Sequence, residues 1–357
     1  RDYYASRGLG DVYKRQQLRM GDRSMEDKLE EVLKQYPCEV HTRRRTRGAF
    51  LLETDQGLRL LKEYSVSQAR IEFEERIKQL LGQQGGLLVD HTYKNNREEY
   101  FTKDNYRNNW VMRRWYAGNE CDIRDQRCVL RCASYLGRLH ALMQLGNEEG
   151  ESYIRKESVQ QEMERHNKEL KRVRSYIRSK KQKNEMEICL LGSYDLFYDQ
   201  ACLAQTLLQE SGYEALWQET LEKGKVRHGS YSYHNVLFVG KDLAVTNFDR
   251  AEIGIQVRDL YDFLRKAMEK NGWQAEFGKS LIDAYDRERK LEETERRVLY
   301  AMLLYPEKYW KLVNFYYNSR KSWMSSKNLE KLLRIRAQEE KRAYFLRELR
   351  PLLCGAC

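Results

Sequence analysis

Alternating apolar and polar positions dominate the chain between about residue 39 and residue 115. Residues 48–53 and 58–64 read as two strands, and the Asp-Gln-Gly sequence at 55–57 joins them in a hairpin. Apolar residues then recur at helical spacing over 67–81, and Gly82 is expected to end that helix. Residues 99–102 and 110–115 predict a second strand pair. This half of the chain is therefore expected to be a small sheet with one helix.

After Gly118 the period changes to that of helices. An amphipathic helix is predicted over 125–145, followed by helical segments over 153–189 and 194–223 and from residue 257 onward. Short strands and a loop interrupt the helices at 226–249. The order predicts an α+β, protein kinase-like fold with two lobes. The expected parts are an N-lobe at 20–116, a hinge at 117–124, a helical C-lobe at 125–346 and a tail at 347–357.

Composition narrows the classes of function without choosing one. The chain of 357 residues carries a net charge of +11, but its basic residues alternate with acidic ones in the predicted helices. We therefore expect solvated helix faces that attract anions, and we do not expect nucleic-acid binding, because no recognised binding module is present. No segment approaches the roughly 18 apolar residues of a membrane span. The eight cysteines form no dense framework, which favours reduced, intracellular thiols.

The first residues of the chain have an unusual sequence. Residues 11–16, DVYKRQ, are what a transposon-end adapter used in sequencing libraries would encode. We interpret residues 1–19 as an adapter-derived segment, with a natural start at Met20 or Met25, and we exclude them from fold reasoning. Their removal is expected to leave the melting temperature unchanged.

Phosphoryl transfer from ATP needs a strand lysine for the phosphates and a helix glutamate that holds it. Lys62 lies on the second strand of the first hairpin, where such a lysine would be; it could equally be a solvated strand residue. Its partner could be Glu72, Glu74 or Glu75, and the sequence does not choose among them. Lys62, Glu72 and Glu75 are our candidates for ATP binding.

The segment HGSYSYHN, residues 228–235, resembles the catalytic loop of the aminoglycoside phosphotransferase and choline kinase superfamily. Asn235 falls where that pattern has its asparagine, and an apolar hairpin follows. Ser230 stands where the resemblance implies the catalytic aspartate, and Asn247 stands where it implies the metal-binding aspartate. A serine is a poor base near neutral pH, and loss of a general base costs roughly 10²- to 10⁴-fold in rate. Asp249 could take over metal binding, together with Asn235.

Other residues are expected to support this loop. His228 belongs to the loop motif, and His140 is expected to be a hydrogen-bonded core histidine. Asp259 matches the superfamily residue that orients the catalytic loop, so it is expected to be part of the scaffold. The Arg-rich segment at 41–48 stands where a phosphate-covering loop would be. Its Arg43 and Arg45 are either an exposed basic hairpin tip or an anion-binding lip.

The remaining sequence resembles the CotS-type spore coat proteins of endospore-forming Firmicutes. The resemblance covers about residues 30–346, and the block YPEKYWKLVNFYYNSRKSW at 305–323 is its most specific part. It implies sporulation, synthesis in the mother-cell cytoplasm, a place in the spore coat, and other coat proteins as partners. With both acids replaced, we expect a pseudokinase that binds ATP and Mg²⁺ weakly or not at all. The alternative is an active small-molecule or protein phosphotransferase.

Overall fold

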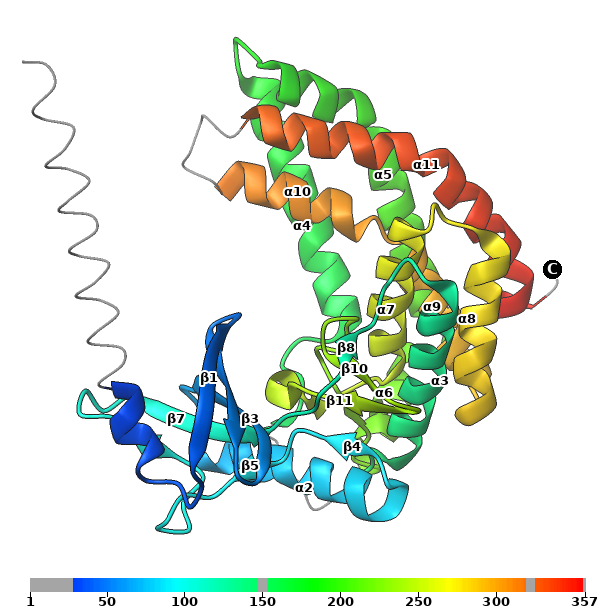
Figure 1. Cartoon of the computed structure of the whole chain (residues 1–357). Helices are drawn as coiled ribbons and strands as arrows, with labels where there is room; N and C mark the ends of the chain where they lie inside the picture. The colour runs from blue at the N-terminus through cyan, green and yellow to red at the C-terminus, as the bar shows by residue number, and fades with distance from the viewer. Residues whose placement is uncertain (1–27, 147–152, 319–324, 356–357) are drawn as a thin grey trace, which may run out of the picture. The chain divides into compact units, whose positions relative to one another are not determined.

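The computed structural model describes residues 28–146, 153–318 and 325–355, and its chain trace is shown in Figure 1. The expected adapter-derived segment, residues 1–19, lies outside these residues. Two compact units are present: an N-terminal unit with residues 28–119 and 239–246, and a C-terminal unit with residues 120–238 and 247–355. The fold is α+β, with a largely antiparallel sheet in the N-terminal unit and mostly helices in the rest, as predicted.

The main sheet of the N-terminal unit has the strand order β1-β2-β3-β7-β5, with β6 paired to β7. Its strands are β1 (Val40–Thr46), β2 (Ala49–Thr54), β3 (Gly57–Glu63), β5 (Thr92–Tyr93), β6 (Thr102–Lys103) and β7 (Asn109–Arg114). The pairing of β2 with β3 confirms the first predicted hairpin. The second pair is shorter than predicted, because residues 99–101 bond to Asn95 instead: its side chain donates to the carbonyl of Phe101 and accepts from the amide of Glu99.

Helix α2 (Gln68–Gly85) is longer than the sequence predicted. The side chain of Ser67 caps its first turn by accepting from the amide of Arg70. The expected stop at Gly82 is wrong, because Gly82 keeps helical geometry. The helix ends instead at Gly86, which has φ of 59° and donates its amide to the carbonyls of Gly82 and Leu81. A residue without Cβ adopts this left-handed conformation at little cost. Strand β4 (Leu88–Val89) follows and pairs in parallel with β11 (Asp242–Val245).

The C-terminal unit is built from helices that enclose its core. They are α3 (Gln126–Leu142), α4 (Val159–Ser179), α5 (Glu185–Glu210), α6 (Tyr213–Glu222), α7 (Val257–Lys270), α8 (Ala275–Glu288), α9 (Glu293–Leu304), α10 (Glu307–Asn318) and α11 (Ser325–Cys354). Two short strands belong to this unit, β9 (Val226–Arg227) and β12 (Glu252–Ile253). Two others contain residues of both units, β8 (Asn119–Glu120) and β10 (Val236–Val239). Helices α3 and α8 run side by side (Figure 1), so closely that a Cβ on Gly137 would lie 2.7 Å from the carbonyl oxygen of Tyr285.

The predicted break between the helical segments 153–189 and 194–223 is in the wrong place. Helix α4 ends at Ser179, and Asn184 starts α5 with a capping box in which its side chain accepts from the amide of Glu187. The capping box gives a helix start that the dense charge pattern concealed. None of the described helices is both long and apolar enough to cross a membrane.

Candidate functional site

Lys62 lies on β3 of the N-terminal unit, opposite Val111 of β7. Its ammonium group sits 4.7 Å from the centre of the Tyr64 ring. The Tyr64 hydroxyl donates a 2.5 Å hydrogen bond to Oε1 of Glu74. Tyr64 therefore connects the candidate lysine to helix α2 through a cation–π contact and a charge-assisted hydrogen bond.

The three candidate glutamates of α2 have different surroundings. Glu72 is exposed and accepts a hydrogen bond from Gln68. Glu74 is fully buried, and its Oε2 lies 2.9 Å from Nη2 of Arg113. Glu74 is thus bonded to Tyr64, the same residue whose ring Lys62 contacts. Its position on the buried face of α2, three residues after Ile71, was the sequence signal that could have selected it.

Glu75 takes part in a separate buried cluster. Its Oε1 accepts from Lys78 at 3.0 Å and from the amide of Thr92 at 2.7 Å, and its Oε2 lies 3.0 Å from Nδ1 of His91. Burial by itself would raise the pKa of Glu75, but the Lys78 charge and these hydrogen bonds outweigh it and lower the pKa to about 2. Glu75 therefore ties α2 to the strands that follow it.

Arg43 and Arg45 lie within strand β1 and not in a loop. The expected phosphate-covering loop at 41–48 is reduced to a tight turn at Arg47 and Gly48, because residues 42–46 pair with β2. Arg43 faces Leu52 and Arg45 faces Phe50 across the strand pair, and both arginines are exposed.

The loop at 228–235 is anchored in the C-terminal unit by Asp259 of α7. The amides of His228 and Gly229 donate to its carboxylate, to Oδ2 at 2.6 Å and to Oδ1 at 3.0 Å respectively. Gly229 has φ of 71°, and a Cβ there would lie only 2.0 Å from the carbonyl oxygen of Arg250. Glycine is thus required by both the backbone conformation and the close approach of residue 250.

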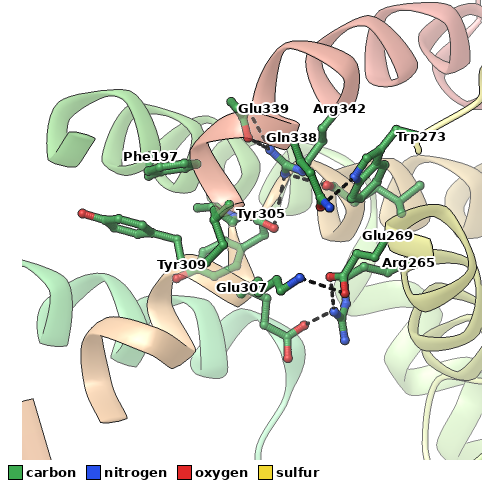
Figure 2. A pocket seen from close by; sticks show the side chains of 14 residues that line it. Phe197, Arg265, Glu269, Trp273, Tyr305, Glu307, Tyr309, Gln338, Glu339 and Arg342 are labelled. Carbon is green, nitrogen blue, oxygen red and sulfur yellow. Dashed lines mark hydrogen bonds and ion pairs between the residues drawn. The ribbon is translucent and has the colours of Figure 1, made fainter. Parts of the chain in front are cut away.

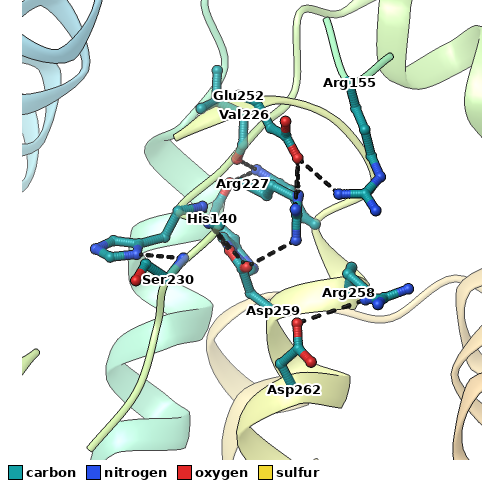
Figure 3. Close-up of polar contacts among 12 residues, drawn as sticks. His140, Arg155, Val226, Arg227, Ser230, Glu252, Arg258, Asp259 and Asp262 are labelled. Carbon is teal, nitrogen blue, oxygen red and sulfur yellow. Dashed lines mark hydrogen bonds and ion pairs between the residues drawn. The ribbon is translucent and has the colours of Figure 1, made fainter. Parts of the chain in front are cut away.

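Asp259 is itself the centre of a buried polar network, shown in Figure 3. His140 places Nε2 at 3.3 Å and Arg227 places Nη1 at 3.5 Å from its carboxylate. Burial would raise the pKa of Asp259, but the hydrogen bond from His140 and the charge of Arg227 lower it to about 2. Burial lowers the pKa of His140, whose Nδ1 lies 2.8 Å from the hydroxyl of Tyr285. Through Asp259, this network holds the start of the loop.

Sequence reasoning missed the outer part of this network. Arg227 contacts Glu252 with Nε at 2.8 Å and Nη2 at 2.6 Å, and Arg155 reaches the same carboxylate at 3.1 Å. Figure 3 shows both guanidinium groups directed toward Glu252. The position of Arg227 immediately before His228 was the available signal. The network connects the segment before α4 to the loop.

Ser230 and Asn235 face each other inside the loop. Nδ2 of Asn235 donates to the carbonyl oxygen of Ser230 at 2.8 Å and lies 3.3 Å from its hydroxyl oxygen. The amide of Ser230 donates to Nδ1 of His228 at 3.2 Å. Both residues are half-buried. These hydrogen bonds close the loop on itself and place the Ser230 hydroxyl beside the Asn235 amide.

Asn247 and Asp249 follow β11. Asn247 has φ of 70°, a left-handed conformation that asparagine adopts more easily than most residues. Phe248 packs its ring 4.5 Å from that of His228, centre to centre, and Asp249 lies on the 3₁₀ turn η2 (Phe248–Arg250). Both polar residues are half-buried. Asn247 and Asn235 supply neutral oxygens, so Asp249 is the one carboxylate of the predicted metal set.

No group of three or more His, Cys, Asp or Glu side chains suited to a metal ion occurs among the described residues. Mg²⁺ is usually bound by one or two carboxylates together with substrate phosphates. A single aspartate with two amides meets that requirement only at its lower limit, so a nucleotide would have to supply phosphate oxygens as further ligands.

The C-terminal unit also has a pocket that contains none of the predicted site residues (Figure 2). The pocket is open to solvent and has a volume of about 420 Å³. It lies between α5, α7, α11 and the junction of α9 with α10. Its charges are paired: Arg265 lies 2.8 Å from Glu269, and Arg342 lies 3.1 Å from Glu339. Glu307, from the block at 305–323, accepts from the hydroxyl of Tyr261 at 2.5 Å. This distinctive block thus fixes helices to one another.

Comparison with known proteins shows the family of the chain. The family model described as "Spore coat putative kinase YutH" matches residues 14–349. Spore coat protein S of Bacillus subtilis (strain 168) is 23% identical over 342 residues, covering 90% of this chain and 93% of that protein.

Solved structures are similar in fold at low identity. The chain matches an aminoglycoside phosphotransferase from Alicyclobacillus acidocaldarius with a TM-score of 0.81 and 17% identity, over 91% of this chain and 96% of that one. A spectinomycin phosphotransferase in complex with ADP and spectinomycin matches with a TM-score of 0.51 and 11% identity, over 87% and 90% of the two chains.

Proposed function

Since the chain belongs to the spore coat putative kinase YutH family, we propose that it is a coat-associated pseudokinase with a structural or interaction role. It keeps the kinase-like fold, while the catalytic loop lacks the groups that phosphoryl transfer needs. We further propose that it is made in the mother-cell cytoplasm and is then assembled with other coat proteins, as its likeness to spore coat protein S supports.

The observation that carries this proposal is the hydrogen bond from Asn235 to the Ser230 carbonyl at 2.8 Å. This bond holds the loop in a closed conformation. The site therefore lacks a proton acceptor because residue 230 is a serine, and not because the loop is displaced. A serine hydroxyl cannot accept a proton from an alcohol or amine usefully near neutral pH.

The metal side of the site supports the same conclusion. Phosphoryl transfer depends on metal ions that bridge the phosphates and neutralise developing charge. Asn247 offers a neutral oxygen where the superfamily pattern has a carboxylate, which weakens Mg²⁺ binding. One site thus lacks two groups: Ser230 replaces a proton acceptor, and Asn247 replaces a charged metal ligand.

Nucleotide binding is a separable part of the proposal. The spectinomycin phosphotransferase of similar fold was solved with ADP. Lys62, next to Tyr64 and Glu74, is the cation that could contact phosphates here. We propose weak ATP binding that gains little from Mg²⁺.

An active phosphotransferase is the second candidate. Asn235 remains in the loop, and Asp249 is a half-buried carboxylate two residues after Asn247. In this alternative Asn235 and Asp249 hold the metal. Calorimetric titration of the purified protein with ATP, with and without Mg²⁺, separates the two candidates. Tight binding that requires Mg²⁺ favours the enzyme, and weak binding that ignores Mg²⁺ favours the pseudokinase.

A further inference from the structure

Strand β1 ends the main sheet of the N-terminal unit and pairs on one side only. Among the described residues, β2 is the single strand paired with it. Figure 1 shows β1 at one edge of this sheet. In an antiparallel pair, every second residue turns its N–H and C=O groups away from its partner. The outer edge of β1 therefore offers a row of backbone groups that another extended chain can pair with.

The side chains along this edge are exposed and basic. All residues from His41 to Arg45 are exposed, including the consecutive arginines Arg43, Arg44 and Arg45. Arg43 lies 4.0 Å from Glu30, a surface pair of the kind that contributes little to stability. Among the described residues, no acidic side chain lies within ion-pair distance of Arg44 or Arg45. The edge is thus open and its positive charge is largely unbalanced.

The register places these arginines on both faces of the sheet. Arg43 and Arg45 face Leu52 and Phe50, which pack with the core cluster of the N-terminal unit. Arg44 faces Leu51 and so lies on the opposite face. A small anion on one face can meet Arg43 and Arg45 but not Arg44. An added strand, whose own side chains alternate between faces, can meet all three.

We propose that β1 docks an extended acidic segment of another protein, which adds to the sheet as a further strand. Backbone pairing would supply affinity, and consecutive acidic residues opposite Arg43, Arg44 and Arg45 would supply specificity. This surface deepens the interaction role proposed above, but it does not depend on whether the protein turns over ATP.

The test uses the full chain and a short capped peptide in which consecutive glutamates are flanked by valines and threonines. Fluorescence anisotropy measures its binding to the unmodified protein. A second peptide of the same sequence is N-methylated at alternate residues, which removes strand hydrogen bonds and keeps the charge. We expect the methylated peptide to bind at least about tenfold more weakly.

The protein variant Arg43→Glu/Arg44→Glu/Arg45→Glu is expected to lose at least about tenfold in affinity for the first peptide. The matched control Arg97→Glu/Lys103→Glu/Arg107→Glu reverses as many exposed charges in the same unit, away from β1, and should bind almost normally. Thermal melts establish that both variants are folded. The methylated-peptide comparison needs no variant and so remains decisive if one fails to fold.

Several results would overturn the proposal. Equal binding of the methylated peptide would show attraction by charge alone, and equal loss in both variants would show an effect of net charge. Displacement of the peptide by ATP would assign the arginines to a nucleotide. Tighter binding of a single-stranded oligonucleotide of equal charge would assign them to nucleic acid. A failure here leaves the calorimetric test of the pseudokinase unaffected, because that test measures ATP and Mg²⁺ only.

Discussion

The backbone amide of His228 donates to the carboxylate of Asp259 at 2.6 Å, from one end of the catalytic-type loop to the first turn of α7. The same carboxylate receives the amide of Gly229 and contacts His140 and Arg227. A buried charge with this many partners determines the position of the loop. Asp259 thus anchors the loop that carries Ser230.

Replacing this carboxylate should destabilise the protein strongly. Asp259→Ala leaves the buried Arg227 without one of its acidic partners and leaves two loop amides without acceptors. Breaking a buried pair in this way costs about 3–5 kcal/mol. Urea denaturation should show a lower midpoint, whereas Asp283→Ala on the exposed side of α8 should change the midpoint little. A loss below about 1 kcal/mol at Asp259 would contradict the role assigned to it.

The lowered pKa of Asp259 predicts how stability depends on pH. Its folded pKa of about 2 lies below the ordinary value of 3.8, so its contribution is complete above about pH 5. That contribution, about 2 kcal/mol, is lost as the pH falls from 4 toward 2. The difference in unfolding free energy between the native protein and Asp259→Asn should therefore shrink over this range. A difference that stays constant down to pH 2 would argue against the lowered pKa.

Glycine 229 should tolerate no side chain. Gly229→Ala would force a Cβ to within 2.0 Å of a backbone oxygen and keep a positive φ. The left-handed conformation alone costs about 1–2 kcal/mol, and the steric conflict adds to it. Gly240→Ala is the matched control, because Gly240 has φ of 60° with nothing within 4 Å of the added Cβ. Thermal melts should show a much larger loss at 229, and equal losses would disprove the close approach.

The two glutamates Glu74 and Glu72 should differ sharply. Glu74→Ala removes one of the buried acidic partners of Arg113 and the acceptor for Tyr64, at a cost of about 3–5 kcal/mol. Glu72→Ala removes an exposed side chain and should change the free energy of unfolding by less than about 0.5 kcal/mol. Chemical denaturation of both variants measures this directly. Similar values for the two would mean that Glu74 is not the glutamate that organises this part of the unit.

The sequence predicted the two-part α+β order well, because strand and helix periods differ clearly on the two sides of Gly118. It predicted the end of α2 poorly, because Gly82 and Gly86 look alike in sequence and differ only in backbone conformation. The boundary between α4 and α5 was misplaced, because the polar residues at 180–184 look like a continuation of the charged helix pattern. The structure shows that a new helix begins there, with a capping box at Asn184.

The site residues were predicted where the chain resembles a known family pattern. The resemblance selected Ser230, Asn235 and Asp259, and the structure brings these three residues into one hydrogen-bonded loop and its anchor. The burial of Glu74 against Arg113 could not be predicted, because Arg113 comes from a strand 39 residues away along the chain. The arginines of β1 were expected in a loop, because a run of arginines gives no strand signal of its own and only the pairing with β2 reveals one.

Restoring the missing acids tests how the two losses combine. Ser230→Asp should return a proton acceptor but not full activity, because Asn247 still offers Mg²⁺ only a neutral oxygen. Ser230→Asp/Asn247→Asp should exceed either single variant in Mg²⁺-dependent ATP turnover. If Ser230→Asp alone reached the activity of the double variant, Asn247 would not be a deficient metal ligand.

The central claim is that the unmodified protein has lost phosphoryl-transfer chemistry while keeping its fold. The most direct measurement is ATP turnover by the purified full chain, with Mg²⁺ and with EDTA, beside the protein-free blank. The account predicts a rate equal to the blank in both conditions. A robust rate that requires Mg²⁺ and disappears in Asp249→Asn would contradict it and would establish the active phosphotransferase instead.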